Sequence, residues 1–130
     1  SKKYFLVCYG DTMVDINFDK YIKFYLKNVK KILVTSYQLK LSFGIMNILK
    51  NNDVVDFKEK PSLDIWYNVG YLIFSSDNFF LFKKFKKFQE LLKFLSKKNL
   101  MRAYKHSGNH ITVNTVAELE MAKKHIKIFK

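Results

Sequence analysis

The chain has 130 residues, with 24 lysine and arginine residues against 11 aspartate and glutamate residues, which gives a formal net charge of +13. This length predicts one domain, and a hydrophobic content of 48%, with 17% aromatic residues, excludes a disordered chain because it is enough to form a packed core. No apolar stretch approaches the ~20 residues of a membrane-spanning helix, and no signal peptide is expected. Cys8 is the only cysteine, so no internal disulfide is expected either. We therefore expect a cytoplasmic protein.

The positive charge favours an anionic partner, such as nucleic acid, an anionic membrane surface or a phosphorylated small molecule. Arg102 is the only arginine, so nearly all of this charge is carried by lysine. Because arginine is the main side chain for bidentate recognition of guanine and phosphate, we favour a solvated lysine surface over a nucleic-acid site. The run FKKFKKFQELLKFLSKK at 82–98 leaves a basic amphipathic surface helix open, although an ordinary helix with an apolar core face is favoured.

The first part of the chain predicts a strand, a helix and a second strand. Residues 4–9 (YFLVCY) form a short continuous apolar run that is typical of a buried strand, and a glycine ends it. Residues 17–28 place apolar side chains on one helical face, with Asn17 as the N-cap, and residues 31–38 predict the next strand. Strand, crossover helix and strand make a right-handed βαβ unit, so the sheet is expected to be parallel here.

The rest of the chain alternates strands and helices. Residues 44–61 predict a hairpin, since Asn51-Asn52-Asp53 separates two strand-like runs and a proline ends the second. The elements expected after it, in chain order, are a strand over 66–74 with an interior glycine, a helix over 76–98, short strands over 100–106 and 110–114, and a final helix from a capping box at Thr115 to about Lys127. No repeat or linker divides residues 1–130, so we expect one α/β domain with a mixed sheet.

Asp11 follows Gly10 at the end of the first expected strand. Open α/β sheets bind ligands outside the carboxyl ends of their strands, where a carboxylate can hold Mg²⁺ beside a phosphate. Taken alone, however, this aspartate is better explained as a residue that caps a turn.

Three further groups carry polar side chains that could serve a site. In FKEKP, Glu59 could bind hydroxyl groups and Lys60 a phosphate, although a charged hairpin edge is clearly the favoured interpretation of this motif alone. In YNVGY, Asn68 and Gly70 fall on the same side of a strand and could face a sugar ring, or form a β-bulge with a hydrogen-bonded asparagine. In ITVNT, Asn114 precedes a helix, and helix capping is the favoured interpretation of this motif alone.

Several catalytic classes are poorly supported by the sequence. The three histidines have no metal-ligand spacing with Cys8 and do not form an H-E-x-x-H motif, which argues against a zinc enzyme. No serine lies in a G-x-S-x-G motif, which argues against a serine hydrolase. Neither a Walker loop nor a G-x-G-x-x-G motif is present.

The order and spacing of the motifs are more specific than any one of them. FLVCYGDTMVDINFDKYIKFYLKN, SFGIMNI, VVDFKEKP, WYNVGYLIF and AYKHSGNHITVNTVAELEMAKK together resemble the sugar-1-phosphate nucleotidyltransferases, over nearly the whole chain. The resemblance implies a Rossmann-like, GT-A-like three-layer α/β/α fold with a mixed sheet. It also implies Mg²⁺-dependent transfer of a nucleoside monophosphate from a nucleoside triphosphate to a hexose or heptose 1-phosphate, with release of pyrophosphate.

The resemblance implies a role for each polar group. Asp11 matches a Mg²⁺ ligand of the family, and Asn114 stands where a second metal ligand is expected, in a place where many members have aspartate. The residues that correspond to sugar and sugar-phosphate contacts are Gly44, Glu59, Lys60, Asn68 and Gly70, with Lys60 also expected to orient the attacking phosphate. Ser42 and Val69 stand where arginine and alanine are more usual, which leaves the sugar unassigned.

One family signature is missing from these residues. The glycine-rich segment G-x-G-x-R-L-x-P-L-T, which lies in the N-terminal half of the family's domain, is not found between residues 1 and 130. We therefore expect residues 1–130 to be the sugar-phosphate- and metal-binding half of a nucleotidyltransferase domain, inactive without an N-terminal half from the same or a separate chain. A homo-oligomer stays open, and a non-catalytic basic module that binds nucleic acid or anionic surfaces is the alternative function.

Overall fold

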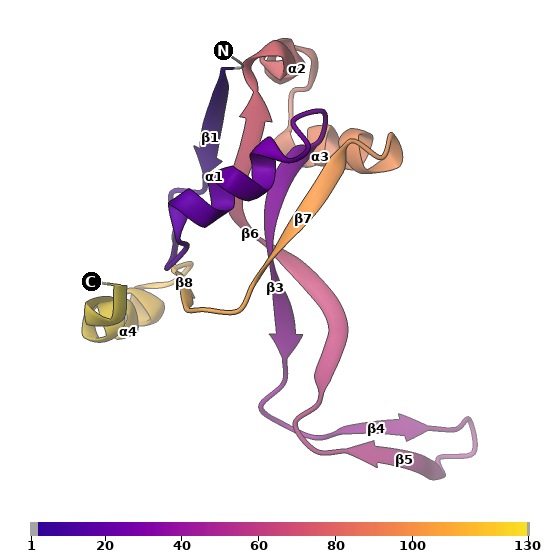
Figure 1. The fold of residues 1–130 in the computed structure, drawn as a ribbon. Coiled ribbons are helices and arrows are strands. Elements are labelled where there is room, and N and C mark those ends of the chain that lie inside the picture. The colour runs from indigo at the N-terminus through magenta and orange to yellow at the C-terminus, as the bar shows by residue number, and fades with distance from the viewer. Residues whose placement is uncertain (1–2, 130) are drawn as a thin grey trace.

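A four-stranded mixed sheet forms the centre of the molecule, in a computed structural model that describes residues 3–129 (Figure 1). The strands lie in the order β1 (Tyr4–Cys8), β6 (Ser62–Ser75), β3 (Ile32–Lys40) and β7 (Met101–His106). β6 is antiparallel to both of its neighbours, whereas β3 and β7 are parallel. The expected α/β fold class with a mixed sheet is therefore confirmed.

The pairing expected around the first helix is wrong in one respect. β1 and β3 flank α1 (Phe18–Leu26) in the sequence and run in the same direction, but β6 lies between them and is antiparallel to both. β6 takes this place because its apolar second half fits a position with cover on both faces. The local prediction is confirmed: Asn17 caps α1, with its side chain accepting a hydrogen bond from the Lys20 N–H at 2.9 Å.

Helices cover both faces of the sheet (Figure 1). α1 packs its buried Tyr21 against one face, in a cluster that includes Ile73 of β6. α2 (Phe80–Lys84) and α3 (Phe88–Lys97) cover the other face, where Leu72 and Phe74 belong to the second cluster. Because successive residues of a strand point to opposite faces, β6 supplies side chains to both clusters.

The prediction of one continuous helix over 76–98 is wrong. It is divided into a 3-10 turn at Ser76–Asn78, α2 and α3, with extended backbone at Phe85 and Lys87. The FKKFKKF pattern repeats every three residues, so on one straight helix successive phenylalanines would drift by about 60° around the axis rather than lie in line. The break allows the rings of Phe82 and Phe88 to stack at 6.1 Å. The apolar side chains of residues 82–98 therefore face the core, as expected for an ordinary helical segment rather than for a basic surface helix.

Two antiparallel pairs lie outside the main sheet. β2 (Thr12–Val14) pairs with β8 (His110–Thr112), and we call these strands the ribbon. β4 (Ile45–Ile48) and β5 (Val54–Lys58) form the hairpin expected from the sequence, which extends away from the sheet (Figure 1).

The last helix begins as expected. α4 (Val116–His125) opens on a complete capping box between Thr115 and Glu118, and a 3-10 turn (Ile126–Phe129) follows it. Between residues 3 and 129, no helix has the length and apolar character required to cross a membrane.

Candidate functional site

Asp11 lies at the junction between β1 and the ribbon. Its main-chain carbonyl accepts a hydrogen bond from the Val113 N–H at 2.9 Å, and its Oδ1 accepts one from the Thr12 hydroxyl at 3.1 Å. Since Val113 directly precedes Asn114, the structure brings the segments of the two predicted metal ligands to the same end of the ribbon. The segment of the second expected ligand thus lies close in space to Asp11, although the two are far apart in sequence.

Asn114 also takes part in capping α4. The N–H groups of Asn114 and Thr115 donate to Glu118 Oε2, at 2.6 and 3.0 Å. The hydrogen bond from the Asn114 backbone is the main cause that lowers the pKa of Glu118 below its usual value. The N-cap of α4 is Thr115 rather than Asn114, which contributes its backbone N–H to the start of the helix. A metal-binding role for the Asn114 side chain stays a prediction.

Two threonines that the sequence did not indicate lie next to Asp11. Thr12 and Thr112 are directly opposite each other in the ribbon, and their hydroxyl oxygens are 3.2 Å apart. Because the Thr12 hydroxyl also reaches Asp11, a row of oxygen atoms runs from the carboxylate to Thr112. Only the register of β2 against β8 brings Thr112 into this row, so no local pattern in the sequence could have indicated it.

The donor set at this end of the ribbon fits a hard cation. Carboxylate, hydroxyl and amide oxygens are the ligands that Mg²⁺ takes from proteins. Among residues 3–129 no three or more His, Cys, Asp or Glu side chains are grouped to hold a metal ion. A Mg²⁺ ion held by one carboxylate keeps most of its positions for water and substrate phosphate.

The base of the hairpin collects three other predicted residues. A Cβ atom placed on Gly44 would lie 3.0 Å from Glu59 Oε2 and 2.5 Å from the Phe57 ring, so a larger residue would require these two side chains to move. Lys60, the next residue, has left-handed backbone with a φ of 42°. The hairpin therefore places Gly44, Glu59 and Lys60 at one end, which we call the hairpin base.

Asn68 and Gly70 form the β-bulge that was one of the two interpretations of their motif. The β3–β6 register shifts between the pairs Val34–Leu72 and Ser36–Asn68, and Gly70 has a φ of 81° at this shift. Asn68 Oδ1 accepts from the Gly70 N–H at 2.8 Å, while its Nδ2 donates to the Tyr9 hydroxyl at 2.9 Å. A side chain on Gly70 would overlap the Tyr9 ring. Contact of this pair with a sugar stays a prediction.

The predicted residues thus form three groups. Tyr9 connects the bulge to the Gly10-Asp11 turn, because it bonds Asn68 and directly precedes that turn. Within residues 3–129 neither a hydrogen bond nor an ion pair links the hairpin base to the ribbon, and Figure 1 shows the hairpin at the far end of β3 and β6 from α2. A substrate that reached both groups would have to span the surface between them.

Asp15 fixes the opposite end of the ribbon and was not indicated by the sequence. Its Oδ1 accepts from the Asn109 N–H at 2.7 Å and lies 2.8 Å from His106 Nε2, while its Oδ2 accepts from Asn109 Nδ2 at 2.8 Å. Partial burial raises the pKa of Asp15, but the hydrogen bonds from Asn109 and His106 outweigh it and leave this pKa below its usual value. This carboxylate holds the β7–β8 loop against β2.

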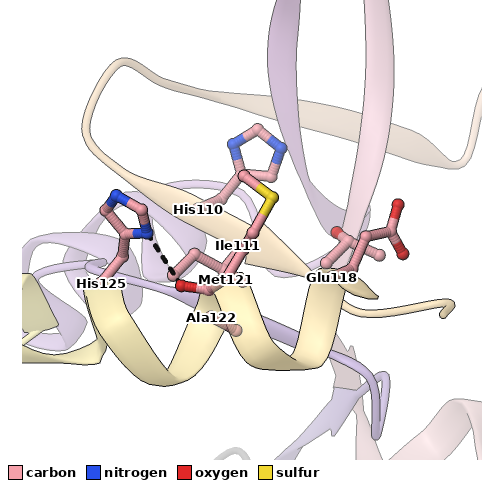
Figure 2. Close-up of a pocket in the computed structure, with 7 residues that line it drawn as sticks. His110, Ile111, Glu118, Met121, Ala122 and His125 are labelled. Atoms are coloured by element: carbon pink, nitrogen blue, oxygen red, sulfur yellow. Dashed lines mark hydrogen bonds between the residues drawn. The ribbon is translucent and has the colours of Figure 1, made fainter. Parts of the chain in front are cut away.

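An apolar groove of about 240 Å³ lies between β8 and α4 (Figure 2). In Figure 2 the Met121 side chain points from α4 toward His110, and the ring of His125 turns back to its own helix, where Nδ1 lies 2.8 Å from the Met121 carbonyl. The groove meets the oxygen row at Thr112, which lines both. None of the predicted site residues lines this groove.

Comparisons with known proteins agree with these observations. The sequence profile of the family described as nucleotidyl transferase matches residues 1–124. No curated protein matches the sequence significantly. Among solved structures, a protein from Bacillus anthracis described as a glucose-1-phosphate thymidylyltransferase, in complex with a sucrose, is 17% identical with a TM-score of 0.67. HddC from Yersinia pseudotuberculosis is 20% identical with a TM-score of 0.60. Each comparison covers 95% of this chain but only 55% of the relative.

Proposed function

Because this chain belongs to the nucleotidyl transferase family, we propose that it forms the sugar-phosphate- and metal-binding part of a sugar-1-phosphate nucleotidyltransferase. In the proposed reaction, an oxygen of the sugar 1-phosphate attacks the α-phosphorus of a nucleoside triphosphate, and pyrophosphate leaves. The observation that carries the proposal is the position of Asp11, at the end of a sheet strand and beside the Asn114 segment. An isolated turn aspartate would not need this second segment beside it.

Asp11 and Asn114 are the residues that we propose hold Mg²⁺. When bound, this ion supplies Lewis-acid neutralisation of the charge that develops on the phosphates. Thr12 donates its hydroxyl hydrogen to Asp11 Oδ1, which fixes the orientation of the carboxylate. The Asn114 backbone is held by Glu118 and its neighbour Val113 by Asp11, so the two ligands keep their relative position.

The hairpin base and the bulge would bind the sugar 1-phosphate. Lys60 would orient the attacking phosphate through a charge-assisted hydrogen bond, and Glu59 would accept hydrogen bonds from sugar hydroxyl groups. Gly44 would contact the sugar through its backbone, beside the Phe57 ring that lies against it. Such a reaction depends on positioning and charge neutralisation, so it needs no nucleophilic side chain.

The chain spans about half the length of the solved relatives that it matches. We therefore propose that these residues act together with the remaining part of a nucleotidyltransferase domain, which would bind the triphosphate. Without that part, the chain should bind metal and sugar phosphate but should not transfer nucleotide.

Metal binding can be tested on the 130-residue chain itself. Mn²⁺ in place of Mg²⁺ should broaden the amide NMR signals of Asp11, Thr12 and Val113, and Asp11→Ala should abolish this broadening while the fold is kept. In an enzyme completed with the missing part, Asp11→Ala should reduce transfer by about 10²–10³-fold, the usual effect of losing a group that stabilises transition-state charge.

Asp77→Ala is the matched control, because Asp77 is an exposed carboxylate near the start of α2. It should change neither the broadening nor the transfer. Broadening that survives in Asp11→Ala, or transfer that is insensitive to this change, would refute the assignment of Asp11.

A further inference from the structure

Trp66 lies on β6 between the hairpin base and the bulge. Its register against β3 is unbroken as far as Asn68, and side chains two residues apart on a strand point to the same face of the sheet. Trp66 and Asn68 therefore share a face. β6 begins at Ser62, just after the hairpin base. Lys40 of β3 is opposite Ser62 and Ser36 is opposite Asn68, so these two pairs lie about 13 Å apart. A ligand that contacts both the hairpin base and the bulge would lie over Trp66.

Lys105 lies beside Trp66 on this face. It is opposite Ser36 on β3, and Ser36 is opposite Asn68 on β6, so the three residues form one row across the sheet. The Lys105 Nζ lies 4.5 Å from the centroid of the Trp66 ring, which is a cation–π contact. Lys105 is exposed, and within residues 3–129 no salt bridge includes it. Its ammonium group is therefore open to an anion from solvent.

Core packing does not account for Trp66. It is the only tryptophan of the chain, yet it belongs to neither of the two core clusters. The cluster under α2 and α3 reaches Val34 on β3, and Figure 1 shows β3 and β6 continuing past these helices toward the hairpin. The Trp66 Nε1–H donates to Asp64 Oδ1 at 3.0 Å, which fixes the orientation of the half-buried ring. The indole is thus held in place outside the core.

We propose that Trp66 and Lys105 form a further contact site for the sugar 1-phosphate, in which the indole stacks on the sugar ring and the ammonium group binds the phosphate. This inference rests on the proposed function. A pyranose ring presents C–H groups on its face, and these pack on an aromatic ring, while a phosphate forms charge-assisted hydrogen bonds with a lysine. Lys105 supplies a second cation, besides Lys60, for a group with two negative charges. The substrate class named by this site is a pyranose 1-phosphate.

The fluorescence of Trp66 tests the proposal without any mutation, because this residue is the only tryptophan. The probe is glucose 1-phosphate, added with Mg²⁺ to the 130-residue chain. The emission should shift to shorter wavelength and quenching by acrylamide should fall, since a stacked sugar excludes water and quencher from the indole. Inorganic phosphate and uridine triphosphate are the comparison probes. Neither should protect the ring from acrylamide, because the first has no sugar and the second requires the remaining part of the domain.

Calorimetry with glucose 1-phosphate measures the contribution of each side chain. Trp66→Ala should weaken binding by about tenfold or more, and Trp66→Phe should weaken it less because a ring remains to stack on the sugar. Lys105→Gln should weaken binding by about tenfold, through the loss of a charge-assisted hydrogen bond. Arg102→Gln is the matched control. Arg102 lies on the opposite face of β7, with its Cζ 4.5 Å from the Phe24 ring, so this change removes a similar cation–π contact and should leave binding unchanged.

An unchanged affinity in Trp66→Ala or in Lys105→Gln would overturn this inference and leave the proposed function standing. Equal protection of the ring by inorganic phosphate or by uridine triphosphate would do the same, because the site would then not select a sugar. If neither glucose 1-phosphate nor mannose 1-phosphate gives any heat of binding, the proposed sugar-phosphate binding itself is refuted, and this inference with it. Circular dichroism would confirm that each variant keeps the fold.

Discussion

Lys60 combines a predicted substrate role with an uncommon backbone conformation. Its φ of 42° is disfavoured for a residue with a side chain, and such positions are often kept at binding sites. Lys60 lies just after the end of β5, so the end of the hairpin sets the backbone position from which its side chain extends.

Lys60→Ala should therefore raise the KM for the sugar 1-phosphate by about 10–100-fold in a completed enzyme, the range of a lost charge-assisted hydrogen bond. The turnover number should change less. Steady-state kinetics would measure both. Lys58→Ala is the control, since Lys58 pairs with Asp56 at 3.5 Å and is well exposed. An unchanged KM in Lys60→Ala would exclude the proposed phosphate contact.

Asp15 is a second residue whose contribution can be measured, through stability rather than activity. Its pKa is lowered in the folded chain, so the stability that the ionised carboxylate adds is present above the unfolded pKa of about 3.8 and is lost as the pH falls through the folded value. Asp15→Asn should lower the free energy of unfolding by about 1–3 kcal/mol at pH 6, and by less near pH 3.

Urea unfolding at several pH values would test this prediction. His106→Asn gives a useful comparison, because it removes one neighbour of Asp15 and leaves both hydrogen bonds from Asn109. Equal losses for Asp15→Asn at pH 6 and pH 3 would contradict the assigned role of the charge.

At the residue scale, local contacts could be predicted and distant ones could not. Asn17 and Thr115 lie within a few residues of the groups they cap, so the sequence alone indicates them. Asp15 and Asn109 are 94 residues apart, and Thr12 and Thr112 are 100 apart. Only the pairing of β2 with β8 brings these side chains together, and no spacing in the sequence encodes that pairing.

At the scale of elements, α4 depends on its ends more than on its packing. None of its residues is buried, and Val116 and Met121 are largely exposed. A helix with so little buried surface derives much of its stability from capping.

Thr115→Ala should destabilise α4 by about 0.5–2 kcal/mol, because it removes the capping hydrogen bond to the Glu118 N–H. The amides of α4 should exchange faster, while those of α1 should not change. Hydrogen exchange with NMR detection would show this, and Thr115→Ser should restore protection since it keeps the hydroxyl group. A general loss of protection across the sheet would mean that α4 supports the fold more than its exposure indicates.

The hairpin and most single elements were predicted correctly, whereas the way they combine was not. Turn residues such as Asn51-Asn52-Asp53 act locally, and they mark the hairpin directly. The break at Phe85 and Lys87 and the insertion of β6 between β1 and β3 both arise from tertiary packing. The order of motifs along the chain was enough to identify the family, because it does not depend on how the strands pair.

At the scale of the whole molecule, stability should depend on pH near neutrality through His110. Its ring lies between the ribbon and the main sheet, with Nε2 2.8 Å from the Tyr67 hydroxyl and the Tyr37 ring at 4.4 Å. Burial lowers the pKa of His110, and the nearby charge of His106 lowers it further. The folded chain therefore favours the neutral imidazole.

Because the folded chain disfavours the charged imidazole, stability falls as the pH drops from the unfolded pKa of about 6.5 to the folded value. The thermal midpoint should therefore fall between pH 7 and pH 5, where each added proton also increases a charge that is already +13. His110→Gln should make this fall less steep. Calorimetry at three pH values would test it, and an equal slope in the variant would exclude His110 as the cause.

The position of β6 also determines the order in which the sheet can be assembled. Tyr4 of β1 pairs with Ser75, and Ile32 of β3 pairs with Met101, so each of these strands must wait for a partner that is synthesised much later. Contacts between residues this distant in sequence slow folding, because the intervening chain must first close into a loop. During synthesis, β1 and β3 therefore emerge before the strand that joins them, and the main sheet can form only once β6 has left the ribosome.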